Sequence, residues 1–101
     1  MAKDLSVCAL LDTYGAFLSG RQRDIMSHYF NDDLSLAEIA ENEGTTRQAV
    51  SDIIRRGEAT LKRYENECGY LSKMSEIKKI CASEAADADK VKRIAEIADG
   101  F

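Results

Sequence analysis

The 101-residue sequence contains no proline and no tryptophan, and glycine occurs only six times. This scarcity of helix-breaking residues, together with an apolar content of 45%, favours helices over a β-sandwich or a β-barrel. No segment alternates polar and apolar residues as a half-buried strand does. We therefore expect an all-α fold, and the length suits one compact domain with an appended helical extension.

Cysteine and histidine are also scarce. Cys8, Cys68 and Cys81 are odd in number and lack the CxxC spacing of a metal site, and His28 is the single histidine. Unpaired thiols of this kind are typical of a reducing cytoplasmic compartment, which is the expected location. The sequence also lacks a glycine-rich phosphate loop and a Ser, His and Asp set. We therefore expect no cofactor, no metal and no enzymatic activity.

Long apolar runs are missing as well. No segment approaches the roughly 20 apolar residues that a transmembrane helix needs. The first twelve residues are interrupted by Asp4 and Asp12 and have no small-residue cleavage site, so we expect no signal peptide. The sequence therefore predicts no membrane partner.

The formal net charge of −4 is distributed unevenly. Residues 31–43 contain five acidic residues and no basic one, whereas residues 45–63 carry a net charge of +3. An evenly acidic surface would argue against a nucleic-acid partner, but here the positive charge is concentrated on one segment. The overall acidity leads us to expect weak or conditional binding to nucleic acid.

The most informative segment is residues 34–56, LSLAEIAENEGTTRQAVSDIIRR. Ser35 and Glu38 have the spacing of a capping box, and Gly44 can take the left-handed conformation that ends a helix. Thr45 and Gln48 repeat the capping-box spacing at the start of a second helix. The segment therefore predicts two short helices joined by a glycine turn, a helix-turn-helix.

The second helix of this motif has two different faces. Ala49, Val50, Ile53 and Ile54 form an apolar stripe facing the core. The opposite face carries Arg, Gln, Ser and Thr, which are side chains that contact phosphates and base edges in the major groove. A purely structural helical hairpin has the same caps and turn, so that alternative stays open. The candidate nucleic-acid-binding residues are Thr45, Thr46, Arg47, Gln48, Ser51, Asp52, Arg55 and Arg56.

Helices are also predicted on both sides of the motif. Apolar spacing indicates helices over residues 4–18 and 21–30, with Ser19 capping the second. The second helix of the motif continues to about Cys68, and Gly57 within it requires either a bend or a close packing contact.

Residues 70–101 predict two further short helices, the second capped by Ser83. These helices either form a homodimer contact, or they only close the core of a single chain or fray in solution, and both alternatives stay open. We therefore expect a helix-turn-helix domain over residues 1–69 and a C-terminal helical extension over residues 70–101. The expected apolar positions are Leu71, Met74, Ile77 and Ile80 on the first helix, and Val91, Ile94, Ala95 and Ala98 on the second.

The block from Leu10 to Tyr70 resembles the YlxM family of small bacterial helix-turn-helix proteins and region 4 of sigma factors. The resemblance rests on Gln22-Arg23, on residues 34–40 and on residues 47–50. It implies an all-helical, sigma region 4-like bundle. For the YlxM family it further implies an association with the signal recognition particle pathway and a regulatory role.

Two functions are compatible with these features. The first is a DNA-binding protein in which Arg47 and Gln48 meet base edges while Thr45, Arg55 and Arg56 hold phosphates. The second is an interaction protein that docks on signal recognition particle RNA or protein, or on the transcription machinery. In that case the acidic segment 31–43 is a contact for a basic partner.

Overall fold

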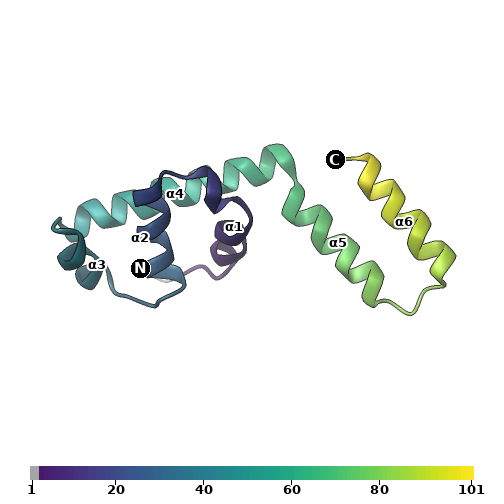
Figure 1. Ribbon diagram of the computed structural model, residues 1–101, viewed down its shortest axis with the longest axis horizontal. Coiled ribbons are helices and arrows are strands. Elements are labelled where there is room, and N and C mark those ends of the chain that lie inside the picture. The colour runs from purple at the N-terminus through teal and green to yellow at the C-terminus, as the bar shows by residue number, and fades with distance from the viewer. Residues whose placement is uncertain (1–2) are drawn as a thin grey trace. The chain divides into compact units, whose positions relative to one another are not determined.

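The computed structural model describes residues 3–101, and over these residues the chain is built from helices without strands. This confirms the expected all-α fold class. No helix in this part of the chain is long and apolar enough to cross a lipid bilayer. The elements in Figure 1 are α1 (Ser6–Tyr14), the 3₁₀ turn η1 (Gly15–Phe17), α2 (Gly20–Phe30), α3 (Leu36–Glu43), α4 (Arg47–Cys68), α5 (Tyr70–Ala82) and α6 (Asp87–Asp99).

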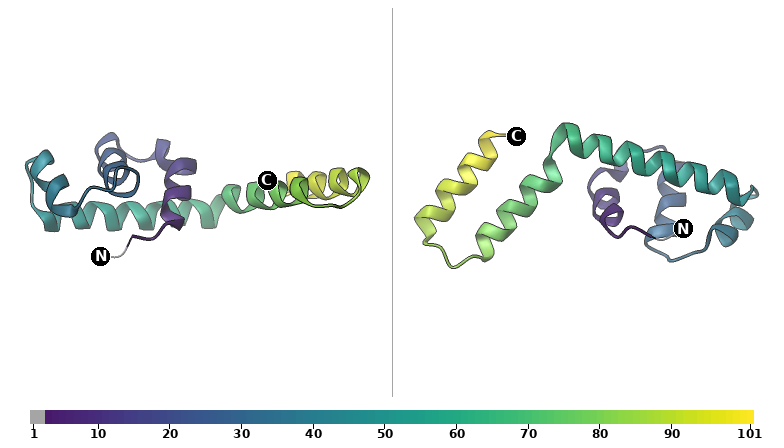
Figure 2. Two further views of the ribbon diagram at one scale, coloured as in Figure 1. Left: turned by 90° about the horizontal axis from the view of Figure 1, so that it is seen from below. Right: turned by 180° about the vertical axis from the view of Figure 1, so that it is seen from behind.

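Internal contacts divide the chain into an N-terminal unit, residues 1–64, and a C-terminal unit, residues 65–101. In the N-terminal unit, α2 and α3 lie on one side of α4 (Figure 2, left). The buried residues of α4 recur every three or four positions, as expected for a helix with one covered face. The opposite face of the first half of α4 is left free. The buried residues of α4 are Val50, Ile54, Gly57 and Leu61.

The predicted helix boundaries around α3 are confirmed. The Ser35 hydroxyl accepts the backbone N–H of Glu38 at 3.1 Å, and the Glu38 carboxylate accepts the backbone N–H of Ser35 at 3.2 Å, which completes the capping box. Gly44 ends the helix with φ of +65°. Ser19 caps α2 as expected, its hydroxyl accepting the N–H of Gln22 at 3.2 Å.

The single helix predicted over residues 4–18 is wrong. The α-helix ends at Tyr14, and the chain tightens into η1 before Leu18 becomes extended. Successive residues of a 3₁₀ helix are rotated further around the axis than those of an α-helix. The apolar side chains of this segment therefore no longer share one face with those of α1. Phe17 is consequently 71% exposed instead of buried, and its ring meets the edge of Tyr64.

Gly57 does not bend α4, which runs without interruption from Arg47 to Cys68. Met26 packs directly against it, and a Cβ on Gly57 would overlap the Met26 Sδ atom. Of the two explanations that the sequence left open, close packing is therefore the one found.

The C-terminal unit contains α5 and α6, which lie side by side as an antiparallel hairpin (Figure 2). Two helices after Gly69 were expected and are confirmed, but the expected cap of the second is wrong. Ser83 donates its hydroxyl to the Ile80 carbonyl at 2.7 Å and so ends α5, while Ala86 stands at the start of α6 without a side-chain cap.

The apolar stripe expected on α6 is also shifted. Val91 is 68% exposed, and Ala95 and Ala98 are exposed as well. Ile94 and Ile97 are the half-buried apolar positions of this helix. α6 begins at Asp87, four residues after Ser83, so the face that meets α5 is set by packing and not by the local cap.

Candidate nucleic-acid interface

The turn between α3 and α4 is closed by backbone hydrogen bonds. Gly44 donates its N–H toward the carbonyls of Ala40 and Glu41, and Thr45 donates its N–H to Ala40 at 3.0 Å. A residue in the left-handed conformation, followed by a hydrogen bond that reaches back five residues from Thr45 to Ala40, is the geometry that redirects a chain after a helix. The turn therefore fixes where α4 starts relative to α3.

Thr46 is the residue that caps α4. Its hydroxyl accepts the backbone N–H of Ala49 at 3.1 Å. The capping box predicted between Thr45 and Gln48 is wrong, because the backbone of Thr45 is still engaged in ending α3. The cap of α4 is therefore one residue later than predicted, and the Gln48 side chain contacts a residue other than the cap.

That contact is with Asp52. Gln48 donates its Nε2 to the Asp52 Oδ1 atom at 3.2 Å, and the Arg55 guanidinium forms an ion pair with the same oxygen. Positions 48, 52 and 55 follow helical spacing and share the uncovered face of α4. We call these three side chains the Asp52 cluster. In this cluster a hydrogen bond holds the amide of Gln48, which was predicted to read a base. The ion pair partly neutralises the charge of Arg55, which was predicted to bind phosphate.

Arg47 lies beside the Asp52 cluster at the first position of α4 and is exposed. It lines a groove of about 380 Å³ that also contains Lys3, Asp33 and Glu38. Lys3 donates a hydrogen bond to Asp33 Oδ1 at 2.6 Å, and this bond, together with the lysine charge, holds the pKa of the Asp33 carboxyl below its ordinary value. The groove thus joins cationic and acidic side chains at the start of the helix-turn-helix.

Arg56 lies in a second groove, of about 240 Å³, which the sequence analysis missed. This groove is lined by Ser19, Arg21, Gln22, Ile53 and Arg56. Two guanidinium groups and the N-terminus of α2 there form a surface that favours an anion such as phosphate. We call it the Arg21–Arg56 groove. Arg21 is a basic residue in the first turn of a capped helix, but only tertiary packing brings it near α4.

The eight predicted interface residues therefore have different environments. Arg47, Gln48, Arg55 and Arg56 are exposed, as is Thr46. Thr45, Ser51 and Asp52 are half-buried. His28 is half-buried, and its Nδ1 atom lies 2.9 Å from the Asp32 carboxylate. In residues 3–101, no group of three or more His, Cys, Asp and Glu side chains is arranged to hold a metal ion.

Comparison with known proteins decides the family. A family model described as "UPF0122: Putative helix-turn-helix protein, YlxM / p13 like" matches residues 1–100. The chain belongs to the UPF0122 family. The resemblance to YlxM proteins inferred from residues 10–70 is thereby confirmed, and it extends over the C-terminal unit.

Relatives of this UPF0122 protein occur in several bacteria. A UPF0122 protein of Clostridium acetobutylicum is 38% identical over 107 residues, covering 96% of this chain and 92% of the relative. A UPF0122 protein of Shouchella clausii is 43% identical over 91 residues, covering 83% of this chain and 84% of the relative. A UPF0122 protein of Clostridium kluyveri is 43% identical over 77 residues, covering 76% and 69%. The UPF0122 similarity thus includes α5 and α6 in the longer matches.

Proposed function

We propose that this UPF0122 protein is a DNA-binding regulatory protein that places the first half of α4 in the major groove of duplex DNA. The uncovered cationic face of α4 is the observation that carries this proposal. Arg47, Arg55 and Arg56 are all exposed, whereas the opposite face of the same helix is buried in the N-terminal unit. A helix with one anchored face and one free basic face suits insertion into a groove.

The roles of the side chains follow from their positions. Arg47 and Gln48 lie in the first turn of α4, which is the part of a recognition helix that reaches base edges. Arg56 of α4 and Arg21 of α2 line one groove and are proposed to hold a phosphate. Thr46 contributes through the cap, which orients the first turn. DNA contact is assigned to residues 1–69, with Thr45, Ser51, Asp52 and Arg55 at the rim of the interface.

Acidic groups set the strength of this binding. The Asp52 carboxylate sits among the proposed DNA contacts, and the whole chain carries a net charge of −4. Each carboxylate near phosphate lowers affinity, and few net counterions are released. We therefore expect modest affinity with a shallow negative dependence on salt, without high-affinity binding to random sequence.

The experiment is a binding titration by fluorescence anisotropy at several salt concentrations. A pool of random duplex DNA is compared with a hairpin from signal recognition particle RNA. The proposal expects binding to duplex DNA with a negative slope of log affinity against log salt. Absence of duplex binding at low salt contradicts it.

A second candidate function is docking on RNA or protein of the signal recognition particle, the pathway to which the family resemblance points. The observation that favours it is the exposed acidic surface around α3, where Asp32, Glu38 and Glu41 are all exposed. Such a surface complements a basic partner. Recovery of particle components from lysate, with and without nuclease treatment, separates a protein contact from an RNA contact.

We further propose that the protein acts as a homodimer through residues 70–101. A dimer presents two α4 helices, which suits a symmetric DNA site.

A further inference from the structure

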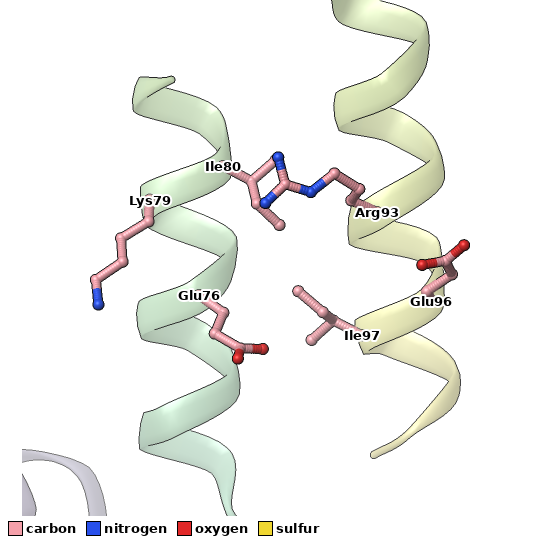
Figure 3. Close-up of a pocket in the computed structure, with 6 residues that line it drawn as sticks. All are labelled: Glu76, Lys79, Ile80, Arg93, Glu96 and Ile97. Atoms are coloured by element: carbon pink, nitrogen blue, oxygen red, sulfur yellow. The ribbon is translucent and has the colours of Figure 1, made fainter. Parts of the chain in front are cut away.

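The grooves on the two units differ in charge. The groove between α5 and α6, of about 440 Å³, is lined by two acidic and two basic side chains. Glu76 and Arg93 extend into the space between the helices (Figure 3). Lys79 and Glu96 point away from that space (Figure 3). The charges therefore cancel, and this groove favours neither an anion nor a cation.

In the N-terminal unit, arginines lie around the turn that leads from η1 into α2. Arg21 and Arg56 line one groove, which contains no carboxylate. The Nε atom of Arg23 lies 3.7 Å from the place that a Cβ on Gly15 would occupy, so this side chain packs against η1. Among residues 3–101, none of these three arginines forms an ion pair with a carboxylate, and all three are exposed. Their charges are therefore available to an external anion such as phosphate.

Phe17 provides an exposed aromatic ring at the same turn. It is 71% exposed and lies two residues before Ser19, which lines the Arg21–Arg56 groove. Two residues of chain span at most about 7 Å, so Phe17 stands beside this groove. Its ring contacts that of Tyr64 with 6.1 Å between the centroids and 70° between the ring planes. An edge-on contact of this kind covers at most one face of a ring, so the Phe17 ring keeps a face open.

Arg63 extends the cationic surface along α4 to these rings. Arg56 and Arg63 are seven residues apart, which is two helical turns, so they share one side of α4. The Arg63 guanidinium lies 5.7 Å from the centroid of the Tyr64 ring. Glu58, the acidic residue between the two arginines, is two positions from Arg56 and so lies on nearly the opposite side of the helix. This side of α4 thus combines arginines with an exposed aromatic ring.

Arginines beside an exposed aromatic ring are the combination that binds single-stranded nucleic acid. Every base has a π-face that can stack on an aromatic side chain, and guanidinium groups hold the backbone phosphates. A base within a duplex has both faces covered by its neighbours in the stack. Only an unpaired base is therefore free to lie on the Phe17 ring.

We propose that this side of α4 binds a nucleotide whose base is unpaired, with its phosphate in the Arg21–Arg56 groove and its base stacked on Phe17. Arg63 is available to the neighbouring phosphate of the same strand. The ligand class is single-stranded nucleic acid, and the stacking position is separate from Arg47 and Gln48, which are proposed to read duplex DNA. The inference rests on the proposed function for the phosphate in the Arg21–Arg56 groove and adds to it a base-stacking position.

The first experiment places a fluorescent reporter at the stacking position. The chain contains no tryptophan, so Phe17→Trp introduces a single indole. Its emission is followed while a thymidine-only DNA strand or a uridine-only RNA strand is added to the full chain at low salt. Stacking on a base is expected to give a saturable loss of emission with one or both strands. Val91→Trp is the matched control, because Val91 is 68% exposed on α6, and its emission is expected to stay unchanged.

The second experiment measures affinity by anisotropy with the same strands carrying a fluorescent label. Phe17→Ala is expected to bind them about 5- to 150-fold more weakly, which is the value of one stacked base, and to bind duplex DNA like the unmodified protein. Arg21→Gln is expected to weaken binding and to reduce the slope of log affinity against log salt by about 0.7. Lys78→Gln removes the same charge from an exposed position of the C-terminal unit and is expected to change neither value.

Three results overturn the inference. The first is unchanged emission of the Phe17→Trp variant with both single strands, or an equal loss of emission with duplex DNA. The second is a loss of emission in Val91→Trp that matches the one in Phe17→Trp. The third is single-strand binding by Phe17→Ala at unmodified strength. Duplex binding without single-strand binding contradicts this inference alone, whereas single-strand binding without duplex binding contradicts the proposed function alone.

Discussion

Met26 of α2 packs against the backbone of Gly57 in α4, at a point where any β-carbon would overlap the methionine sulfur. Met26 is fully buried, so its side chain has little room to move aside. This contact brings α2 close to α4 and so helps hold the N-terminus of α2 beside the half of α4 that is proposed to face DNA. The Arg21–Arg56 groove depends on that approach.

Gly57→Ala is expected to destabilise the protein. Alanine gains up to about 1 kcal/mol in helix propensity, but overpacking against a buried side chain costs about 1–3 kcal/mol. The net loss is measured as a lowered midpoint of urea or thermal unfolding. Gly20→Ala is the matched control, because nothing lies within 4 Å of a Cβ at Gly20. Equal stability of the two variants contradicts this role of Gly57.

Arg47→Ala and Arg56→Ala are expected to affect DNA binding differently. Arg47 is proposed to meet base edges, so its loss costs about 1–3 kcal/mol on a preferred site and little on random sequence. Arg56 is proposed to hold phosphate, so its loss weakens binding to all sequences and reduces the salt slope by about 1. Selection from a random duplex pool followed by anisotropy measures both effects. Equal losses on every sequence for both variants argue against base reading.

Asp52→Asn is expected to strengthen DNA binding. The change removes a negative charge from the interface and releases the Arg55 guanidinium from its ion pair. An exposed ion pair is worth about 0–1 kcal/mol, so the gain in affinity is expected to be about 2- to 5-fold at low salt. Competition anisotropy against the unmodified chain measures it. Weaker binding together with a changed base preference would show instead that Asp52 itself contacts a base.

Asp4 provides a test by pH. Its carboxylate accepts hydrogen bonds from the hydroxyl and the backbone N–H of Ser6, and these bonds hold the pKa of Asp4 below its ordinary value of 3.8. A lowered pKa in the folded state stabilises the protein above the unfolded pKa, and that stabilisation is lost as the pH falls through the folded pKa. Ser6→Ala is expected to raise the pKa of Asp4 toward 3.8 and to leave that of Asp33 unchanged. Carboxyl titration by NMR measures both values, and an unmoved Asp4 refutes the assignment.

Local sequence signals predicted the features that depend on neighbouring residues. Ser35 with Glu38 and the left-handed Gly44 require only a few residues of chain to be recognised, and both are confirmed. The cap of α4 was misplaced because Thr45 and Thr46 are chemically equivalent. Only the hydrogen bond from Thr45 back to Ala40 shows which of them still belongs to the turn.

The features that were missed depend on residues distant in sequence. The reason for Gly57 lies in Met26, on a different helix. The role of Arg21 was missed because the groove that it lines with Arg56 forms only when α2 packs near α4. The face of α6 that meets α5 was misjudged because Val91, Ala95 and Ala98 form an apolar pattern as regular as the one that packs.

The most direct test of the proposed function removes two free cations from the exposed face of α4. Arg47→Gln with Arg56→Gln is compared with Lys78→Gln with Lys92→Gln, which changes the net charge equally in the C-terminal unit. Anisotropy at low salt with a preferred duplex selected from the random pool is the measurement. The account predicts that the first variant loses most of its affinity and that the second binds like the unmodified protein. Equal affinity of the two variants would contradict the assignment of α4 as the DNA-binding helix.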